Sequence, residues 1–336
     1  MERLIKGIVI LGVFTLVTLN GVATSTQAAG PEVILRYAGN LTVDHHLTEN
    51  QRFFAKLVME RTNGKVEVQV FPAAQLFSDK DLPKALPAGA VEMGLATMEF
   101  WHGLVPSFVF LNLPFLVDSF PYQHRVLESE VSEILKEDLL KRAGVRLLYW
   151  AYYGGGCFIS KKPLRTLEDF KGQRIRSLGE TMSVMISCLG AVPTALGGGE
   201  VYMGLQRGII DGAITPIGAV PKRKDYEVTK HLTYPYLSIA IVGALINEKI
   251  WNSLSSDVQK IMLEAAKAAE IKSFNDAQKA DEEALAVAKE KGMEINTPSE
   301  EEKARWKKAC KELFDLPVKR AGETGRVLLE KTEKLR

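Results

Sequence analysis

Hydrophobic residues in the first third of the chain follow two spacings in turn, which predicts strands alternating with helices. Residues 33–38 are typical of a buried strand, and apolar residues recur at helical spacing over 47–58. Apolar residues alternate with polar neighbours over 66–70, which predicts a second strand, and residues 91–97 predict a third. A short helix is expected over 82–86. This order of strand, helix, strand, helix and strand favours a parallel sheet.

The middle of the chain contains the stretch around which we expect a binding site to form. A helix is predicted over about 122–142, and a strand from 145–149 runs through aromatic residues into three glycines at 154–156. Glycines permit backbone angles that other residues resist, so this segment is either a crossover between domains or an ordinary flexible turn. Residues 171–216 predict a short strand with two arginines, an amphipathic helix, a turn, a second helix and another short strand. Two strand ends would then meet at the carboxyl edge of an open α/β sheet, where ligands bind.

The last third of the chain is predominantly helical. A helix over about 220–229 and an apolar strand over 237–246 come before a capping box at 256–259, which begins with Ser256. Helical spacing then persists for about 35 residues, or roughly 50 Å at 1.5 Å per residue. A helix of this length is longer than one domain needs, so we expect it to lie across two. A final helical region is predicted from about residue 300 to the end.

The composition is that of a globular protein with an export signal. The chain has 336 residues, of which 46% are hydrophobic and 25% charged, and its formal net charge of +2 argues against a nucleic-acid binder. A positively charged start, a mainly apolar run over 7–19 and a small-residue exit predict a signal peptide over residues 1–28. The apolar run is shorter than the roughly 20 residues of a membrane-spanning helix. We therefore expect cleavage after Ala28 or Ala29, rather than a retained anchor, and a mature protein secreted to the periplasm.

Sequence motifs for catalysis are absent. The chain has no His-Glu-x-x-His pair, no Gly-x-Ser-x-Gly elbow, no phosphate-binding loop and no paired cysteines. We therefore expect no enzymatic activity, no cofactor and no bound metal. Adjacent His45 and His46 are predicted to lie in a solvated turn. Cys157, Cys188 and Cys310 are predicted to be buried thiols, with a disulfide between the first two as the alternative.

Two arginines, Arg174 and Arg176, carry the chemistry that we place at the sheet edge. A guanidinium has a planar fork that matches both oxygens of a carboxylate. Alternate residues of a strand share one face, so periodicity does not distinguish the two arginines. The alternative for either is a surface arginine in a weak ion pair. The residues therefore suggest capture of a carboxylate close to this strand.

Several segments of the chain resemble those of one transport family. They are Phe71-Pro72-Ala73-Ala74-Gln75-Leu76, Leu113-Pro114-Phe115, Lys171-Gly172-Gln173-Arg174-Ile175-Arg176 with the four residues before it, Leu189-Gly190-Ala191, Glu200-Val201-Tyr202-Met203-Gly204-Leu205-Gln206-Arg207-Gly208 and Asp211-Gly212. In their order and spacing the chain resembles the extracytoplasmic solute-binding protein of a tripartite ATP-independent periplasmic (TRAP) transporter, of the dicarboxylate-binding type. The resemblance covers nearly all of the mature sequence.

The resemblance implies a two-lobed periplasmic-binding-protein clamp. In this α/β fold each lobe has a mixed, mostly parallel sheet flanked by helices, and a long helix spans both lobes. Lobe I would comprise residues 31–152 and 238–277, and lobe II residues 153–237 and 278–336. The arginine that anchors the ligand in this family falls on Arg176. Its implied role is a paired, charge-assisted hydrogen bond to an organic carboxylate.

Further ligand-binding positions follow from the resemblance. They are Asn40, Thr97, Met98, Trp101, Trp150, Tyr152, Gly198 and Thr215. Each could equally serve core packing or a loop cap, and aromatic residues are most often core.

The chain departs from the sialic-acid binders of this family at three positions. Those proteins carry a second arginine where this chain has Gly156, an asparagine where it has Thr215 and an aromatic residue where it has Gly198. A sugar acid is therefore not expected. The missing polar anchors and the space beside the glycines favour a monocarboxylate with an apolar or aromatic body. A small four-carbon dicarboxylate is the alternative.

Delivery of the ligand to the membrane permease subunits of a TRAP transporter is the role that the resemblance implies. The alternative is a periplasmic, sensor-associated ligand-binding module, because one scaffold hosts many roles. A sensor would normally carry a signalling domain on the same chain, and we expect none here. We expect a monomer whose closed form is favoured because the ligand contacts both lobes.

Overall fold

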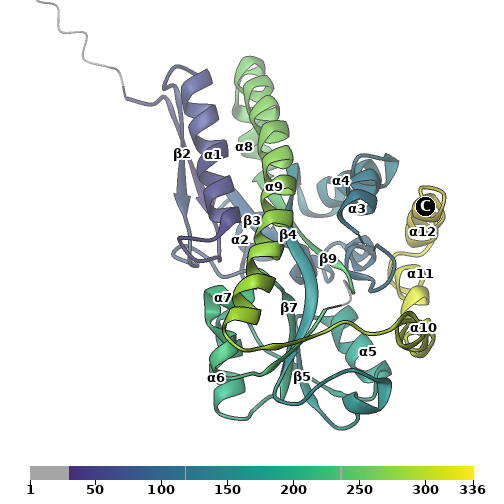
Figure 1. Ribbon diagram of the computed structural model, residues 1–336. Coiled ribbons are helices and arrows are strands. Elements are labelled where there is room, and N and C mark those ends of the chain that lie inside the picture. The colour runs from purple at the N-terminus through teal and green to yellow at the C-terminus, as the bar shows by residue number, and fades with distance from the viewer. Residues whose placement is uncertain (1–29, 118, 235–236) are drawn as a thin grey trace, which may run out of the picture. The chain divides into compact units, whose positions relative to one another are not determined.

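A mixed sheet of ten strands lies at the centre of the computed structural model, which describes residues 30–117, 119–234 and 237–336. The strands are β1 (Val33–Ala38), β2 (Val66–Phe71), β3 (Met93–Thr97), β4 (Val145–Ser160), β5 (Arg174–Ser177), β6 (Val192–Ala195), β7 (Gly212–Pro216), β8 (His231–Thr233), β9 (Ile239–Asn247) and β10 (Glu294–Asn296). Their order is β2-β1-β3-β9-β4-β7-β5-β6, and β8 pairs with both β4 and β10 (Figure 1). The signal peptide predicted for residues 1–28 lies outside the described residues.

Two parallel sets of strands are joined by an antiparallel centre. β1 pairs in parallel with β2 and β3, and β5 pairs in parallel with β6 and β7. β9 runs antiparallel to β3 on one side and to β4 on the other. From Gly156 onwards β4 leaves β9 and pairs with β7, so this one strand contributes to both halves of the sheet. The prediction of an α/β fold with mixed sheets is confirmed.

Helices cover both halves of the sheet (Figure 1). The α-helices are α1 (His46–Arg61), α2 (Leu82–Ala85), α3 (Phe120–Leu127), α4 (Glu130–Ala143), α5 (Glu180–Cys188), α6 (Val201–Gln206), α7 (Ala219–Arg223), α8 (Glu248–Ser253), α9 (Ser256–Glu290), α10 (Glu300–Ala309), α11 (Leu316–Ala321) and α12 (Glu323–Glu333). Short 3-10 helices are η1 (Met98–Trp101), η2 (Pro106–Asn112), η3 (Leu167–Phe170), η4 (Gly198–Glu200), η5 (Asp225–Glu227) and η6 (Lys311–Asp315).

Two predicted helices are interrupted, each for a local reason. The helix expected over 122–142 is two helices, because the hydroxyl of Ser129 accepts a 3.2 Å hydrogen bond from Val131 N and begins α4. The helix expected over 220–229 ends early, because Lys224 adopts a left-handed conformation with φ of 58° and terminates α7.

Three further predictions need correction. The N-cap of α9 is Ser255, one residue before the predicted Ser256, and its hydroxyl accepts from Val258 N. The predicted turn near residue 192 contains the strand β6, whose pairing with β5 is not visible in local periodicity. The terminal helical region is divided into several helices, with Gly322 at a φ of 56° between α11 and α12.

The three glycines at 154–156 lie within β4 and do not form a turn. The register of β4 against β9 shifts between Tyr152 and Gly154, where the strand bulges. Gly154 has a φ of 140°, and a Cβ atom there would lie 2.5 Å from Oδ1 of Asp281. The other oxygen of Asp281 accepts a 2.7 Å hydrogen bond from Gly155 N. Glycine is therefore required where the helix α9 contacts the crossing strand.

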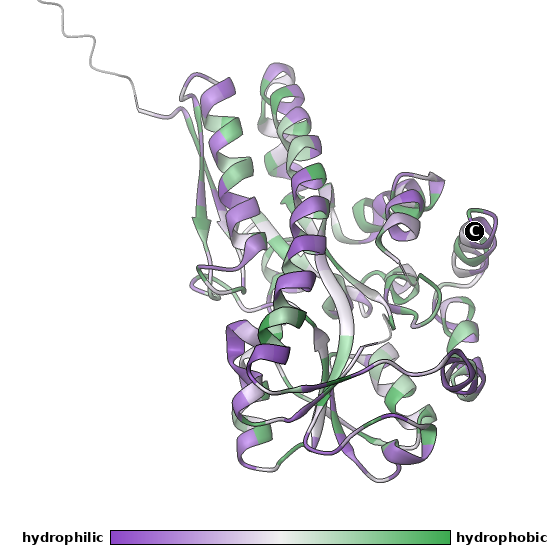
Figure 2. Cartoon of the chain, viewed as in Figure 1, coloured by the Kyte–Doolittle hydropathy of each residue, from purple (hydrophilic) through white to green (hydrophobic). Residues whose placement is uncertain are grey.

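The long helix α9 packs against both halves of the sheet, as predicted for a helix of 35 residues. Its first half contributes Met262 and Ala269 to the core that α1, β1 and β2 share. Its second half contributes Ala284 and Ala288 to the core around β7 and α6. Polar and apolar residues alternate along the helix in Figure 2. Small alanines on the buried side let the helix approach both layers closely.

Candidate ligand-binding site

A cavity of about 640 Å³ lies where the two parallel sets of strands end. Asn40 follows β1 and Thr97 ends β3, whereas Arg176 and Thr215 lie in β5 and β7 of the second set and Gly198 follows β6 in η4. Other polar side chains in its wall are Thr42, His45, Ser78, Asp79, Lys80, Glu99, Asn112, Tyr153, Glu200, Lys222, Arg223 and Ser238, and apolar ones include Leu41, Phe100, Leu178, Met182, Ile214 and Ile241. The cavity therefore occupies the carboxyl edge at which ligands bind in α/β sheets.

Arg176 is a buried cation in the cavity wall, with an exposed fraction of 1%. Its Nε donates to the carbonyl of Leu196 and its Nη1 to that of Ile214, both at 2.9 Å. Its Nη2 makes no hydrogen bond to a described residue. Burial and, next, the charge of Arg223 lower the pKa of Arg176 to about 10, so the group is protonated at neutral pH. The guanidinium of Arg176 is therefore fixed and desolvated, and its Nη2 has no acceptor among the described residues.

Arg174, two residues earlier on the same strand, has a different role. It is exposed, and its Nε and Nη2 donate to the two carboxylate oxygens of Asp211 at 2.9 and 2.7 Å. This contact is the surface ion pair considered for either arginine. The tertiary structure thus places Arg176, and not Arg174, against the cavity.

A second arginine, Arg223, was missed by the sequence analysis. It lies at the end of α7, where its Nη2 donates to the hydroxyl of Thr215 at 2.8 Å and to Asp225 at 2.7 Å. The side chain of Asp225 is fully buried and that of Arg223 is 17% exposed. Two basic residues at a helix end resemble an ordinary solvated terminus, so the local pattern offered no signal.

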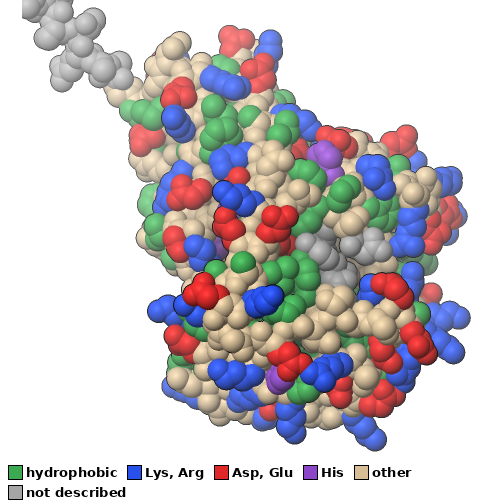
Figure 3. Space-filling view, in the orientation of Figure 1, with side chains coloured by type: hydrophobic (Ala, Val, Ile, Leu, Met, Phe, Trp, Pro, Cys, Tyr) green, Lys and Arg blue, Asp and Glu red, His purple; other side chains and the backbone are tan. Residues whose placement is uncertain are grey.

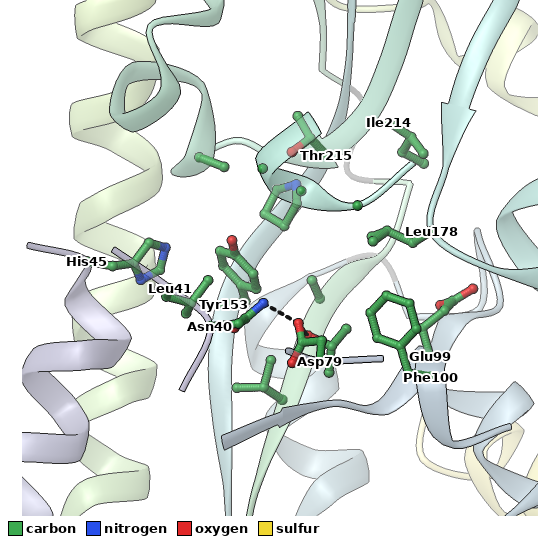
Figure 4. A pocket seen from close by; sticks show the side chains of 18 of the residues that line it. Asn40, Leu41, His45, Asp79, Glu99, Phe100, Tyr153, Leu178, Ile214 and Thr215 are labelled. Atoms are coloured by element: carbon green, nitrogen blue, oxygen red, sulfur yellow. Dashed lines mark hydrogen bonds between the residues drawn. The ribbon is translucent and has the colours of Figure 1, made fainter. Parts of the chain in front are cut away.

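Asp79 connects two of the predicted positions, Asn40 and Thr97. One of its oxygens, Oδ2, accepts hydrogen bonds from the amide of Asn40 and, at 2.9 Å, from the hydroxyl of Thr97. Figure 4 shows the Asn40–Asp79 contact on one side of the cavity, with Thr215 on the other and Tyr153 between them. Burial raises the pKa of Asp79 to about 6, so this carboxylate is mainly ionised at neutral pH.

Glu99 is a buried acid at the opposite end of the cavity from His45 (Figure 4). Burial raises its pKa to about 8, although a backbone hydrogen bond from Met182 and the charge of Arg176 oppose the shift. The group is therefore mainly neutral at pH 7. A Cβ atom on Gly179 would lie 2.6 Å from Cγ of Glu99, so the segment after β3 touches the start of α5. This contact joins the two sets of strands.

The prediction of a solvated turn at His45 and His46 is wrong. His45 is 3% exposed and lines the cavity, and its ring lies 4.4 Å from that of His46 and 5.0 Å from that of Tyr153. Its Nδ1 accepts from Leu47 N at the start of α1, which places the proton on Nε2. Burial lowers the pKa of His45 to about 3, so the ring is a neutral hydrogen-bond donor.

Four predicted site residues lie outside the cavity lining. Met98 and Trp101 are the first and last residues of η1, and their side chains are buried in the core. Trp150 donates from Nε1 to Ser132 in α4, at 2.7 Å. The hydroxyl of Tyr152 lies 2.9 Å from Nδ1 of His124. Successive strand residues point to opposite faces, so Tyr153 takes the cavity position on β4.

Basic and acidic side chains are intermixed over the face shown in Figure 3. Within residues 30–117, 119–234 and 237–336, no helix has both the length and the apolar character needed to cross a membrane. The three cysteines in the same ranges are free, and no three His, Cys, Asp or Glu side chains there are grouped as metal ligands.

Solved structures share this architecture. A TRAP periplasmic solute-binding protein from Sulfurospirillum deleyianum, with bound succinate, is 30% identical, covers 91% of this chain and 100% of its own, and has a TM-score of 0.83. Another from Desulfovibrio salexigens, with bound orotic acid, is 26% identical, covers 90% of this chain and 98% of its own, and has a TM-score of 0.86. Both are two-lobed periplasmic binding proteins, so the predicted clamp fold is confirmed.

Sequence comparisons agree with the structural ones. The C4-dicarboxylate-binding periplasmic protein DctP of Rhodobacter capsulatus is 29% identical over 320 residues, which are 93% of this chain and 95% of the relative. A solute-binding protein of a Sulfitobacter species is 31% identical over 73% of this chain and 74% of the relative. The family model for bacterial extracellular solute-binding proteins, family 7, matches residues 37–319 of this chain. These proteins are non-enzymatic periplasmic receptors of TRAP transporters, and this chain belongs to their family.

Proposed function

We propose that this protein captures an organic monocarboxylate through Arg176 and delivers it to the membrane permease subunits of a TRAP transporter. The observation that carries the proposal is the buried guanidinium of Arg176, which has no carboxylate partner among the described residues and lines a cavity of about 640 Å³. A ligand carboxylate would supply the missing counter-charge. Because the site is desolvated, the resulting hydrogen bonds would be stronger than on the surface.

The hydrogen bonds of Arg176 prepare it for this role. Two backbone carbonyls, from Leu196 and Ile214, accept from Nε and Nη1 and hold the plane of the guanidinium. The unused Nη2, together with the second hydrogen of Nη1, can then donate to two oxygens of one carboxylate. Little side-chain entropy remains to be lost when the ligand binds.

The pairing of the basic residues in the cavity wall favours a ligand with one carboxylate. Arg223 is paired with Asp225, Lys222 is 2.9 Å from Asp44, and Lys80 is 4.0 Å from Glu200. Of the basic residues in the described cavity wall, Arg176 is thus the one without an acidic partner.

The shape and polarity of the walls favour an apolar or aromatic body. Phe100, Leu178 and Ile241 supply apolar surface. A Cβ atom on Gly198 would have no atom within 4 Å, which leaves open space at the position where the sialic-acid binders carry an aromatic residue.

A small dicarboxylate is the second candidate, and Arg223 is the observation that favours it. Its charge is close enough to contribute to the lowered pKa of Arg176, so a second carboxylate could lie between the two groups. The relative from Rhodobacter capsulatus is named for C4-dicarboxylate binding, and the protein from Sulfurospirillum deleyianum holds succinate.

Capture by closure of two lobes completes the proposal. Lobe I would comprise residues 31–152 and 238–277, and lobe II residues 153–237 and 278–336, with the change of lobe where β4 bulges. Ligand contacts from both sets of strands would favour the closed form, which the permease would recognise. The chain would act as a monomer in the periplasm after cleavage of the signal peptide.

A screen of organic acids on the mature protein tests the proposal. Thermal shift followed by calorimetry should identify acids that bind to the wild type and bind at least tenfold more weakly to Arg176→Lys, because a compact ammonium lacks the planar fork that donates to both oxygens of a carboxylate. Arg174→Lys is the matched control and should keep wild-type affinity. If acids bind equally well to Arg176→Lys, another group captures the carboxylate. If a dicarboxylate binds best, the second candidate is favoured.

A further inference from the structure

Two buried oxygens in the described cavity wall have no hydrogen-bond partner, Oδ1 of Asp79 and Oε1 of Glu99, and of these Asp79 is the residue that is mainly ionised at neutral pH. Asp79 is 9% exposed, and its Oδ2 accepts from both Asn40 and Thr97. Its other oxygen, Oδ1, is buried without a hydrogen bond to any described residue. A buried acceptor left unsatisfied costs roughly 1–3 kcal/mol. Native proteins satisfy most such atoms, and this one belongs to a charged residue that lines the cavity, so a partner on the ligand is a natural explanation.

The two donors hold the carboxylate of Asp79 in a defined orientation. Asn40 follows β1 and Thr97 ends β3, and these strands pair in parallel through Ala38 and Gly94. Residues at two neighbouring strand ends therefore donate hydrogen bonds to Oδ2 from the same edge of the sheet. With Oδ2 occupied in this way, Oδ1 is the carboxylate oxygen that has no partner among the described residues. Asn40 and Asp79 are seen together at the cavity wall in Figure 4.

Asp79 and Arg176 belong to different halves of the site. Asp79 lies between β2 and α2, beside the first parallel set, whereas Arg176 lies in β5 of the second set. A ligand that reaches both would touch the two sets with opposite kinds of group. Its carboxylate would meet the guanidinium, and a hydrogen-bond donor would meet the carboxylate of Asp79.

We propose that Oδ1 of Asp79 accepts a hydrogen bond from an N–H or O–H group of the ligand. The protein then selects carboxylates that carry such a donor away from the carboxyl group, such as hydroxy acids or acids with a ring N–H. This inference rests on the proposed capture of a carboxylate by Arg176. An acid without the donor would leave Oδ1 buried and unpaired, and sites of this kind discriminate strongly against ligands that lack the matching group.

Matched pairs of acids test the inference at pH 7.5. Each pair differs in a single donor: pyrrole carboxylate and furan carboxylate, para-hydroxybenzoate and para-fluorobenzoate, and gamma-hydroxybutyrate and valerate. In calorimetric titrations of the wild type, the donor-bearing member of at least one pair should bind at least tenfold more tightly. Equal affinities within every pair would overturn the inference.

Two substitutions assign the preference to Asp79. In Asp79→Asn the amide oxygen can still accept from Asn40 and Thr97, so an N–H group replaces Oδ1 and the preference should disappear or reverse. Asp81→Asn is the control on the same turn, because Asp81 is exposed and should keep the wild-type preference. Survival of the preference in a folded Asp79→Asn would overturn the inference. If that variant does not fold, Thr97→Val should weaken the preference by loosening the carboxylate, and an unchanged preference would count against it.

The outcomes separate this inference from the proposed function. If acids bind through Arg176 but show no dependence on Asp79, the donor preference alone is wrong. If no acid binds, or if Arg176→Lys changes nothing, the proposed capture itself is wrong.

Discussion

The hydroxyl of Thr215 accepts a 2.8 Å hydrogen bond from Nη2 of Arg223, and its neighbour Ile214 accepts from Arg176 through its carbonyl. Two successive residues at the end of β7 therefore hold the two arginines of the cavity. Because the hydroxyl of Thr215 acts as an acceptor toward Arg223, its own proton is available to the cavity. Thr215 is thus suited both to orient a cation and to contact a ligand.

The first prediction concerns this threonine. Thr215→Val keeps the shape of the side chain but removes both the acceptor and the hydroxyl proton. We expect ligand affinity to fall about fivefold, equivalent to about 1 kcal/mol for one hydrogen bond. Calorimetric titration with an acid that binds the wild type measures the change. Thr233→Val is the control, since Thr233 makes a buried 2.8 Å bond to Leu164 away from the cavity and should affect stability without affecting affinity. Equal affinities for Thr215→Val and wild type would remove Thr215 from the site.

Gly198 provides the second prediction, on ligand size. A phenylalanine at this position would occupy the open space in the cavity wall, where no atom lies within 4 Å of a Cβ. Gly198→Phe should therefore weaken large acids by at least tenfold and leave an acetate-sized acid within about twofold of wild type. Gly103→Phe is the control, because Gly103 also has open space around it but lies outside the cavity lining. Similar losses for large and small acids would show that the space at Gly198 does not hold the ligand body.

The third prediction concerns Asp281, the acid of α9 that contacts β4. Burial raises its pKa to about 7, from an ordinary value of 3.8, although the hydrogen bond from Gly155 opposes the shift. Between these values the folded state binds more protons than the unfolded state, so this group makes the free energy of unfolding fall as the pH rises from about 4 to about 7.

Asp281→Asn should remove that dependence, because the amide stays neutral and still accepts from Gly155. We expect the variant to match wild type near pH 4.5 and to exceed it at pH 8 by an amount on the order of 3 kcal/mol. Urea unfolding at the two pH values measures the difference. Asp79 and Glu99 add slopes of the same sign to both proteins, so the comparison is between variant and wild type. Asp276→Asn, on the same helix, is the control and should keep the pH dependence of the wild type. If Asp281→Asn also kept the wild-type pH dependence, Asp281 would not be its source.

Lobe closure is the subject of the fourth prediction. The cavity is lined from both parallel sets of strands, so a ligand that binds there should draw them together. Small-angle scattering should give a smaller radius of gyration for the wild type with a bound acid than without it. The Arg176→Lys variant in the same acid should keep the radius of the free protein. Identical wild-type profiles with and without ligand would exclude closure.

Local periodicity was sufficient for much of the fold. The strand predicted over 33–38 is β1, and the long helix predicted from residue 256 is α9. Both elements have an apolar pattern within their own residues, and α9 also has a serine cap directly before its first residue. The interruption at Ser129 and the strand β6 depend on a single side-chain cap and on pairing with β5, and neither alters the hydrophobic pattern. Such features are decided by contacts and not by spacing.

The candidate site shows the same division. The sequence by itself determined the residue types: a carboxylate-matching arginine near 174–176, polar residues after the strands, and glycines that leave space. Only the tertiary structure decided that Asp211 pairs with Arg174, whereas Arg176 has no acidic partner among the described residues. It also decided that Tyr153, rather than Tyr152, faces the cavity. It also brought Arg223 and Asp79 to the wall, because a partner distant in the chain leaves no trace in the local spacing of either residue.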